Sequence, residues 1–390
     1  MYCSAMFTIP KVPDRQRSML RFLLVLSVAS MVGLQGWRTL FNNFAVEWAH
    51  LEGHHIGVIQ SVREIPGFLA LFAVWAMLLI REHHLSALSI MVLGIGVGFT
   101  GFFPSYGGLA ATTLLLSFGF HYYETTNQSL TLQYFDSKTA PLVLGFIRSL
   151  SAATNIAVGV VVYFMSWYLD YRMMFIVVGV LVAGVGIWGL GQNPVDHELE
   201  PQKRRMVFRW KYRLFYFLTF MAGARRQIFI AFAVFLLVKV FSFSVKEVTV
   251  LFVLNNVIGY FISPLVGRAI VRFGERKVLT LEYTAMVLIF LAYAITGSRW
   301  VAAGLYVLDN LFFNFSIAIR TYFQKVADRK DIASSMAMGF TINHTAAVIL
   351  PVIGGVLWMV DYRIPFIAGS LLSLISLIAV QRIPGKPIEN

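Results

Sequence analysis

The chain has 390 residues, of which 58% are hydrophobic and 13% are charged, and its mean hydropathy is +0.72. A soluble domain carries roughly 25% charged residues, so this chain has too little charge to cover a water-facing surface. The net charge of +13 does not indicate nucleic-acid binding, because Lys and Arg lie between apolar runs and form no single patch. The composition predicts an integral membrane protein.

Apolar runs of helical length follow one another along the chain, and a helix needs roughly 20 such residues to cross a bilayer core. Six of them lie near residues 18–46, 56–79, 84–102, 107–133, 140–167 and 171–190. Six more lie near residues 214–239, 247–267, 277–296, 299–324, 331–358 and 362–381. The sequence therefore predicts an all-α membrane protein of about twelve transmembrane helices.

One polar segment divides these runs into two groups. We expect a cytoplasmic N-terminal tail, a first six-helix bundle, a cytoplasmic linker, a second six-helix bundle and a cytoplasmic C-terminal tail. Their expected ranges are 1–17, 18–190, 191–213, 214–381 and 382–390. An even number of spans puts both termini on one side of the membrane. In that arrangement 21 Lys and Arg residues lie on the side of the termini and five on the opposite side. The positive-inside rule then predicts that both termini are cytoplasmic.

The two groups repeat each other in sequence. The pattern W-x-x-D-Y-R-x-x-F begins at Trp167, before the sixth run, and again at Trp358, before the twelfth. The pattern R-x-[LI]-F-x-x-F-A-V begins at Arg38 in the first run and at Arg226 in the seventh. Because both matched pairs start from the same side of the membrane, the repeat predicts two halves related by an axis along the membrane normal.

The segment between the eighth and ninth runs, GRAIVRFGERKVL, resembles the cytoplasmic loop signature of the major facilitator superfamily. The positions that fit this resemblance are Gly267, Arg272, Gly274, Arg276 and Lys277. The resemblance implies that they form a gating loop, that two pseudo-symmetric six-helix bundles enclose a central cavity, and that the chain is a secondary transporter working by alternating access. It implies no particular substrate.

Polar side chains inside the runs recur at helical spacing. In the fourth run, Ser117, His121, Glu124, Gln128 and Thr131 step by four or three residues and share one helix face. Charged groups in a membrane normally face a bundle interior or a water-filled cavity. The resemblance implies that the first, fourth, seventh and tenth runs line that cavity, and most of the polar stripes lie on them.

Arginine dominates the candidate binding residues. Arg38 and Arg226 occupy matched repeat positions, and a guanidinium group binds carboxylate or phosphate through a fork of donors. Arg225 adjoins Arg226, and we expect only one of the two to face the cavity, since adjacent helical residues diverge by about 100°. The complete set of candidate substrate-binding residues is Gln35, Arg38, Asn42, Gln128, Arg148, Arg226, Asn310 and Asn314.

Three residues are candidates for proton coupling: Glu124, His121 and Asp309. We expect His121 to assist Glu124 and an ion pair with Arg148 to restrain it. We interpret Asp309 as the only acid within the runs of the second half. A surplus of arginine over acid predicts an anionic substrate. We also expect Arg63 to pair with Glu64.

Two other functions remain open. The aromatic content permits an efflux carrier for amphipathic or drug-like compounds, and a membrane sensor or scaffold that transports nothing would have its cavity filled by bulky apolar residues. The sequence predicts no enzyme, no catalytic residues, no metal site and no cofactor, and its single cysteine, Cys3, offers no disulfide. We expect a monomer in a bacterial inner membrane whose partners are the lipid bilayer, a small solute and, if transport is proton-coupled and not an exchange, H⁺, with no nucleic acid.

Overall fold

The computed structural model describes residue 10, residues 12–195 and residues 207–384, and it is helical throughout with no strand in those ranges. Most of the expected linker and parts of both tails lie outside the described residues. The helices of the first half are α1 (Asp14–Glu47), α2 (Gly53–Phe68), η2 (Leu69–Phe72), α3 (Ala73–Leu79), α4 (Glu82–Thr100), α5 (Tyr106–Tyr134), α6 (Ala140–Met165) and α7 (Tyr171–Leu190).

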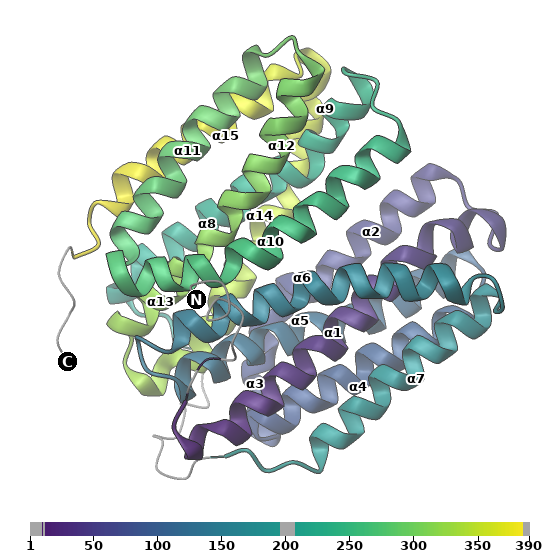
Figure 1. Ribbon diagram of the computed structural model, residues 1–390, viewed down its shortest axis with the longest axis horizontal. Helices are drawn as coiled ribbons and strands as arrows, with labels where there is room; N and C mark the ends of the chain where they lie inside the picture. Colours follow the sequence, from purple (N-terminus) through teal and green to yellow (C-terminus); the bar gives the residue numbers. More distant parts are fainter. Residues whose placement is uncertain (1–9, 11, 196–206, 385–390) are drawn as a thin grey trace, which may run out of the picture.

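The second half forms a separate bundle, drawn in green and yellow in Figure 1. Its helices are η3 (Trp210–Tyr212), α8 (Arg213–Ile228), η4 (Phe229–Ala233), α9 (Val234–Lys239), α10 (Val245–Phe273), α11 (Glu275–Ile295), α12 (Arg299–Phe313), η5 (Asn314–Ser316), α13 (Ile317–Val326), η6 (Arg329–Asp331), α14 (Ile332–Val360) and α15 (Arg363–Val380). Ten helical stretches in the described residues are long and apolar enough to cross a membrane. Two further helices, α5 and α14, have 29 residues each and are also long enough. The predicted fold class is confirmed.

Three of the spans are interrupted near their middle. The second span passes from α2 through the 3-10 turn η2 into α3, after Pro66, whose ring removes a helical hydrogen bond. The seventh changes to the π-helix η4 directly after Arg225 and Arg226. The tenth passes through the 3-10 turn η5 between α12 and α13. Such irregular backbone inside a membrane is tolerated where it is buried in protein or lines a cavity.

The repeated W-x-x-D-Y-R-x-x-F motif lies where two helices begin. The Asp170 carboxylate caps α7 by accepting a hydrogen bond of 2.8 Å from the backbone N–H of Met173. The Asp361 carboxylate accepts one of 2.9 Å from the backbone N–H of Arg363, the first residue of α15. These bonds satisfy donors that a helix start leaves unpaired.

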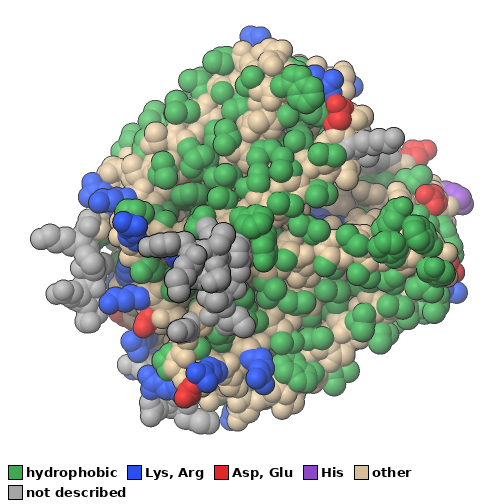
Figure 2. Space-filling view, viewed as in Figure 1, with side chains coloured by type: hydrophobic (Ala, Val, Ile, Leu, Met, Phe, Trp, Pro, Cys, Tyr) green, Lys and Arg blue, Asp and Glu red, His purple; other side chains and the backbone are tan. Residues whose placement is uncertain are grey.

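The two halves meet on the side of the membrane where α1 begins, at Asp14, and α15 ends, at Val380. The side-chain amide of Gln324, on α13, donates hydrogen bonds of 2.7 and 2.6 Å to the carbonyl oxygens of Leu132 and Phe135 at the end of α5. On the opposite side the halves separate, and a hollow that contains Lys or Arg side chains opens between them (Figure 2). The structure is thus closed toward the termini and open away from them.

Helices α6 and α10 run side by side across this closed contact (Figure 1). A methyl group added at Gly145 would lie 2.6 Å from the carbonyl oxygen of Ser263, and one at Gly267 would lie 2.5 Å from that of Pro141. Real side chains do not approach a backbone oxygen so closely, so glycine is what allows the halves to close here.

Gly145→Ala should therefore shift the protein away from this conformation. Spin labels at Ser137 and Arg272, both exposed on the closed side, would report a longer distance between the halves, with Cys3 replaced by serine in all variants. Gly184→Ala is the matched control, because nothing lies within 4 Å of its added methyl group. A Gly145→Ala distance distribution identical to that of the parent protein would show that this contact does not control closure.

Candidate functional site

Two arginines from opposite halves face the opening between them. Arg38 on α1 and Arg226 on α8 are both exposed. Arg38 nevertheless interacts electrostatically with charged groups on α2, α5 and α8, all in the interior, so its exposure is to the hollow and not to lipid. The Arg226 guanidinium lies 4.6 Å from the centre of the Phe313 ring, which supports it from one side. The two arginines at the matched repeat positions are thus both exposed and interact electrostatically with each other.

Arg148 reaches from α6 into the second half. Its guanidinium donates hydrogen bonds of 3.3 and 3.0 Å to the carbonyl oxygens of Phe313 and Asn314, and one of 3.2 Å to the hydroxyl of Ser316. These carbonyl groups are available because η5 interrupts the helix. Arg148 therefore joins the two halves and does not form the expected ion pair with Glu124.

Glu124 lies beside the same cavity on α5. Its carboxylate accepts a hydrogen bond of 3.1 Å from the amide of Gln128, one turn further along. No cation lies within 4 Å of it among the described residues, but electrostatic interactions connect it to Arg38, Arg148 and Arg320. Glu124 is thus one acid among several arginines.

A second charged cluster lies inside the second bundle, around a small cavity that Arg226 also lines. Arg225 turns away from the cavity, as expected for one of the two adjacent arginines, and its Nη2 atom lies 3.6 Å from Glu282 Oε1 on α11. Asp309 on α12 is 3% exposed. Together with Arg225 and Glu282 it lines this small cavity of about 20 Å³, which has room for one water molecule. Asp309 Oδ2 has no hydrogen-bond partner among the described residues.

This cluster corrects one interpretation of the sequence. Asp309 is not the only acid in the second half's spans, because Glu282 is buried in α11 with 3% of its surface exposed. The structure also places Asp309 with Arg225 and Glu282, apart from Glu124 and Arg38.

The remaining candidate binding residues are divided between the cavity and the helix contacts. Asn42 is exposed on α1, and Gln35, half-buried, donates a hydrogen bond of 3.3 Å to Thr39. The Asn314 amide donates to the carbonyl of Asn310 at 3.1 Å and accepts from Ser263 at 3.2 Å, so it stabilises the break at η5. The candidate residues most open to solvent are therefore Arg38, Asn42 and Arg226.

The expected gating loop joins α10 to α11 on the closed side. Gly274 ends α10 with φ of +80°, a backbone angle that glycine adopts without strain. The Arg276 guanidinium donates hydrogen bonds of 3.3 and 3.1 Å to the side-chain oxygen of Gln381, whereas Arg272 and Lys277 are exposed. Gly267 lies nearly two helical turns before Gly274, in the α6 contact described above.

The sequence analysis missed one cluster at the boundary between the halves. Glu64 on α2, His121 on α5 and His344 on α14 place their side-chain ligand atoms within 4.8 Å of one another. Glu64 also pairs with Arg63 at 2.8 Å, as expected. Nothing in the sequence connects residues so far apart, although the polar group of Asn343, His344 and Thr345 inside an apolar run was a signal that α14 faces the interior.

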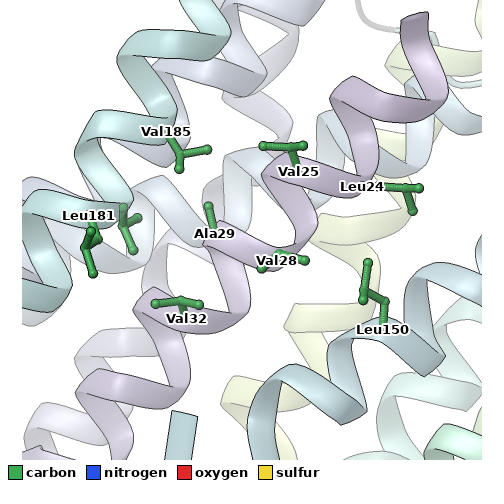
Figure 3. Close-up of a pocket in the computed structure, with 9 residues that line it drawn as sticks. Leu24, Val25, Val28, Ala29, Val32, Leu150, Leu181 and Val185 are labelled. Atoms are coloured by element: carbon green, nitrogen blue, oxygen red, sulfur yellow. The ribbon is translucent and has the colours of Figure 1, made fainter. Parts of the chain in front are cut away.

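An apolar pocket of about 380 Å³ lies elsewhere, between α1, α6 and α7 (Figure 3). Its lining includes Val28, Leu150 and Leu181, and none of the lining side chains is polar. It has no group that could orient a polar solute, so the cavity between the halves is the candidate site.

Comparison with known proteins identifies the family. The sequence model of the Major Facilitator Superfamily matches residues 19–350. The chain belongs to the Major Facilitator Superfamily. A search of curated protein sequences finds no match. The superfamily fold supports secondary transport of a small solute across a membrane.

Several solved transporters of the superfamily share this fold over nearly their whole length. The human organic anion transporter MFSD10 (TETRAN) matches with a TM-score of 0.78 and 12% identity, covering 95% of this chain and 100% of that one. FucP in its outward conformation gives 0.76 and 13%, covering 94% and 99%. A bacterial homologue of the iron transporter ferroportin, in an outward-facing state, gives 0.76 and 13%, covering 93% and 98%. At such identities they show the fold alone.

Proposed function

We propose that this superfamily member carries a small organic anion across the membrane by alternating access, with the anion bound between Arg38 and Arg226. The observation that supports the proposal is that these two arginines, from matched positions of the two halves, are both exposed and interact electrostatically with each other. A cleft lined by surplus positive charge attracts ions of opposite charge, so surplus arginine favours a ligand that supplies negative charge. The human relative MFSD10 is itself an organic anion transporter.

The charges around the cavity support the same ligand class. Arg225 is paired with Glu282 and Arg63 with Glu64, so neither arginine contributes to the net charge around the cavity. Arg38 and Arg226 remain, together with Arg148 and Arg320, against two carboxylates: that of Glu124, and that of Asp309, which lines the same small cavity as Arg226. The exposed polar residues at the opening also argue against a scaffold whose cavity is filled by apolar side chains.

The direction of the opening follows from the same proposal. If the basic residues mark the cytoplasmic side, both termini are cytoplasmic and the cavity opens outward. FucP and the ferroportin homologue were also solved facing outward. We propose that the two bundles, 18–190 and 214–381, rock about the bound anion and that the linker 191–213 connects them.

A ligand screen by thermal stability tests the proposal. A compound that binds only the folded protein raises its melting temperature by an amount that grows with ligand concentration. Organic carboxylates or phosphates should raise it, whereas sugars, neutral amino acids and hydrophobic cations should not. Stabilisation by hydrophobic cations alone would instead support an efflux carrier for drug-like compounds.

We propose that Glu124 couples transport to protons. An anion that draws Arg38 and Arg320 toward itself removes positive charge from around Glu124 and favours protonation of its carboxylate. Glu124→Gln should then abolish accumulation driven by a pH gradient in proteoliposomes, while exchange of labelled for unlabelled substrate continues in part.

Glu47→Gln is the control, because this acid is exposed at the end of α1 and only accepts a hydrogen bond of 2.9 Å from Tyr171. Uphill transport by the Glu124→Gln protein at the parent rate would show that another group carries the proton.

A further inference from the structure

Three side chains that are good ligands for transition metals converge where the two halves meet. Glu64 lies on α2 and His121 on α5, in the first half, while His344 lies on α14, in the second. One ligand atom from each lies within 4.8 Å of the others. Around a tetrahedral ion with bonds of about 2.1 Å, ligand atoms are roughly 3.4 Å apart, so side-chain shifts of about an ångström would complete the site.

His344 is already oriented as a metal ligand. Its Nδ1 atom lies 3.0 Å from the carbonyl oxygen of Phe340, one helical turn earlier, which fixes the proton on Nδ1. Its Nε2 atom, with the free lone pair, then faces Glu64 Oε2 at 3.8 Å. Histidines that bind metals almost always donate their other ring N–H in this way. Gly67 lets the backbone of α2 lie against this ring, since an added methyl group would collide with it.

Glu64 and His121 each keep one potential ligand atom that forms no hydrogen bond among the described residues. Arg63 holds Glu64 through Oε1, with hydrogen bonds of 3.3 and 2.8 Å, and leaves Oε2 toward His344. His121 is 5% exposed, and its Nδ1 atom has no hydrogen-bond partner among the described residues. The two imidazole rings are 4.7 Å apart and nearly perpendicular, at 85°. A buried nitrogen without a partner is rare and calls for an explanation.

We propose that Glu64, His121 and His344 form a binding site for a divalent transition-metal ion such as Zn²⁺ or Fe²⁺, shared between the two halves. Two imidazoles and one carboxylate are a donor set that such ions prefer, and Ca²⁺ or Mg²⁺ would require more oxygen ligands. Because α14 belongs to one half and α2 and α5 to the other, the bound ion joins the halves. It therefore stabilises the conformation that is closed toward the termini.

Metal binding to the purified protein, with no organic anion present, tests this site. Zn²⁺ should raise the melting temperature, and Co²⁺ should give the visible absorption bands of a tetrahedral nitrogen and oxygen site. His344→Ala and His121→Ala should each weaken Co²⁺ affinity at least about 10–100-fold. Because the assay contains no anion, its failure is distinguishable from failure of the transport proposal.

His84→Ala is the control for adventitious binding, because the His83 and His84 rings lie 4.1 Å apart on α4, a helix that carries none of the three proposed ligands. It should keep both signals. His344→Gln, which preserves the size of the side chain, separates loss of the ligand from loss of folding and should also lose the bands. Co²⁺ bands that persist in His121→Ala and His344→Ala, or that disappear only in His84→Ala, would overturn the proposal, as would the absence of any metal-induced stabilisation in the parent protein.

Discussion

Glu282→Ala should lower the free energy of unfolding by about 3–5 kcal/mol, because it leaves the guanidinium of Arg225 buried without its partner. The two side chains are only 5% and 3% exposed, and the Nη2–Oε1 distance is 3.6 Å. Stacking of Arg225 over the Tyr283 ring, at 4.2 Å, cannot replace a carboxylate. Asp309 in the same cavity offsets part of the loss, which places the expected value toward the lower end. Unfolding in detergent by heat and by SDS measures the effect.

An exposed ion pair provides the control. Lys211 and Asp328 are 2.7 Å apart, closer than Arg225 and Glu282, but their side chains are 45% and 47% exposed. Lys211→Ala should cost at most about 1 kcal/mol, because water screens such pairs. The double variant Arg225→Met with Glu282→Leu removes both charges and should recover much of the stability lost in Glu282→Ala. Equal losses in Glu282→Ala and Lys211→Ala would show that burial of the pair has no energetic consequence.

Arg38→Ala and Arg226→Ala should each weaken anion binding about 10–100-fold, because a hydrogen bond to a charged group contributes about 1.5–3 kcal/mol. The substrate identified by the stability screen would be titrated calorimetrically into each purified variant. Arg38→Lys keeps the charge but loses the planar fork of donors, so it should also weaken binding sharply if the contact is bidentate.

Arg172→Ala is the matched control for loss of a positive charge. Arg172 is exposed at the start of α7, on the same side of the membrane as the opening, with its guanidinium 4.7 Å from the Phe102 ring. Its removal should leave the dissociation constant within about twofold of the parent value, because screening in water weakens distant charges. Arg38→Ala and Arg226→Ala proteins that fold and keep the parent affinity would exclude both residues from the binding site.

The spans and the matched positions of two exposed arginines could be predicted, because they depend on local patterns. Hydrophobic runs of helical length predict the spans, and the sequence repeat assigns Arg38 and Arg226 to equivalent positions in the two halves. Adjacent residues on a helix point in directions about 100° apart, which predicts that the side chains of Arg225 and Arg226 point differently. These inferences need only the period of a helix and the cost of charge in a membrane.

The partners of the buried charges could not be predicted, because they come from other helices. Glu282 pairs with Arg225 across two helices, and a single acid in an apolar run carries no sign of its partner. Arg148 bonds to the backbone at η5 and not to Glu124, because the helix breaks there and frees carbonyl groups that the sequence does not mark. His344 meets Glu64 and His121 only when the halves are assembled.

The central claim is that the cavity between the halves carries an anion, and counterflow in proteoliposomes tests it most directly. Vesicles loaded with the unlabelled anion should accumulate the labelled anion through the parent protein and through Arg172→Ala. The double variant Arg38→Ala with Arg226→Ala should reduce that exchange to the level of protein-free vesicles. Exchange at the parent rate through the double variant, or exchange of cationic solutes alone by the parent protein, would contradict the account.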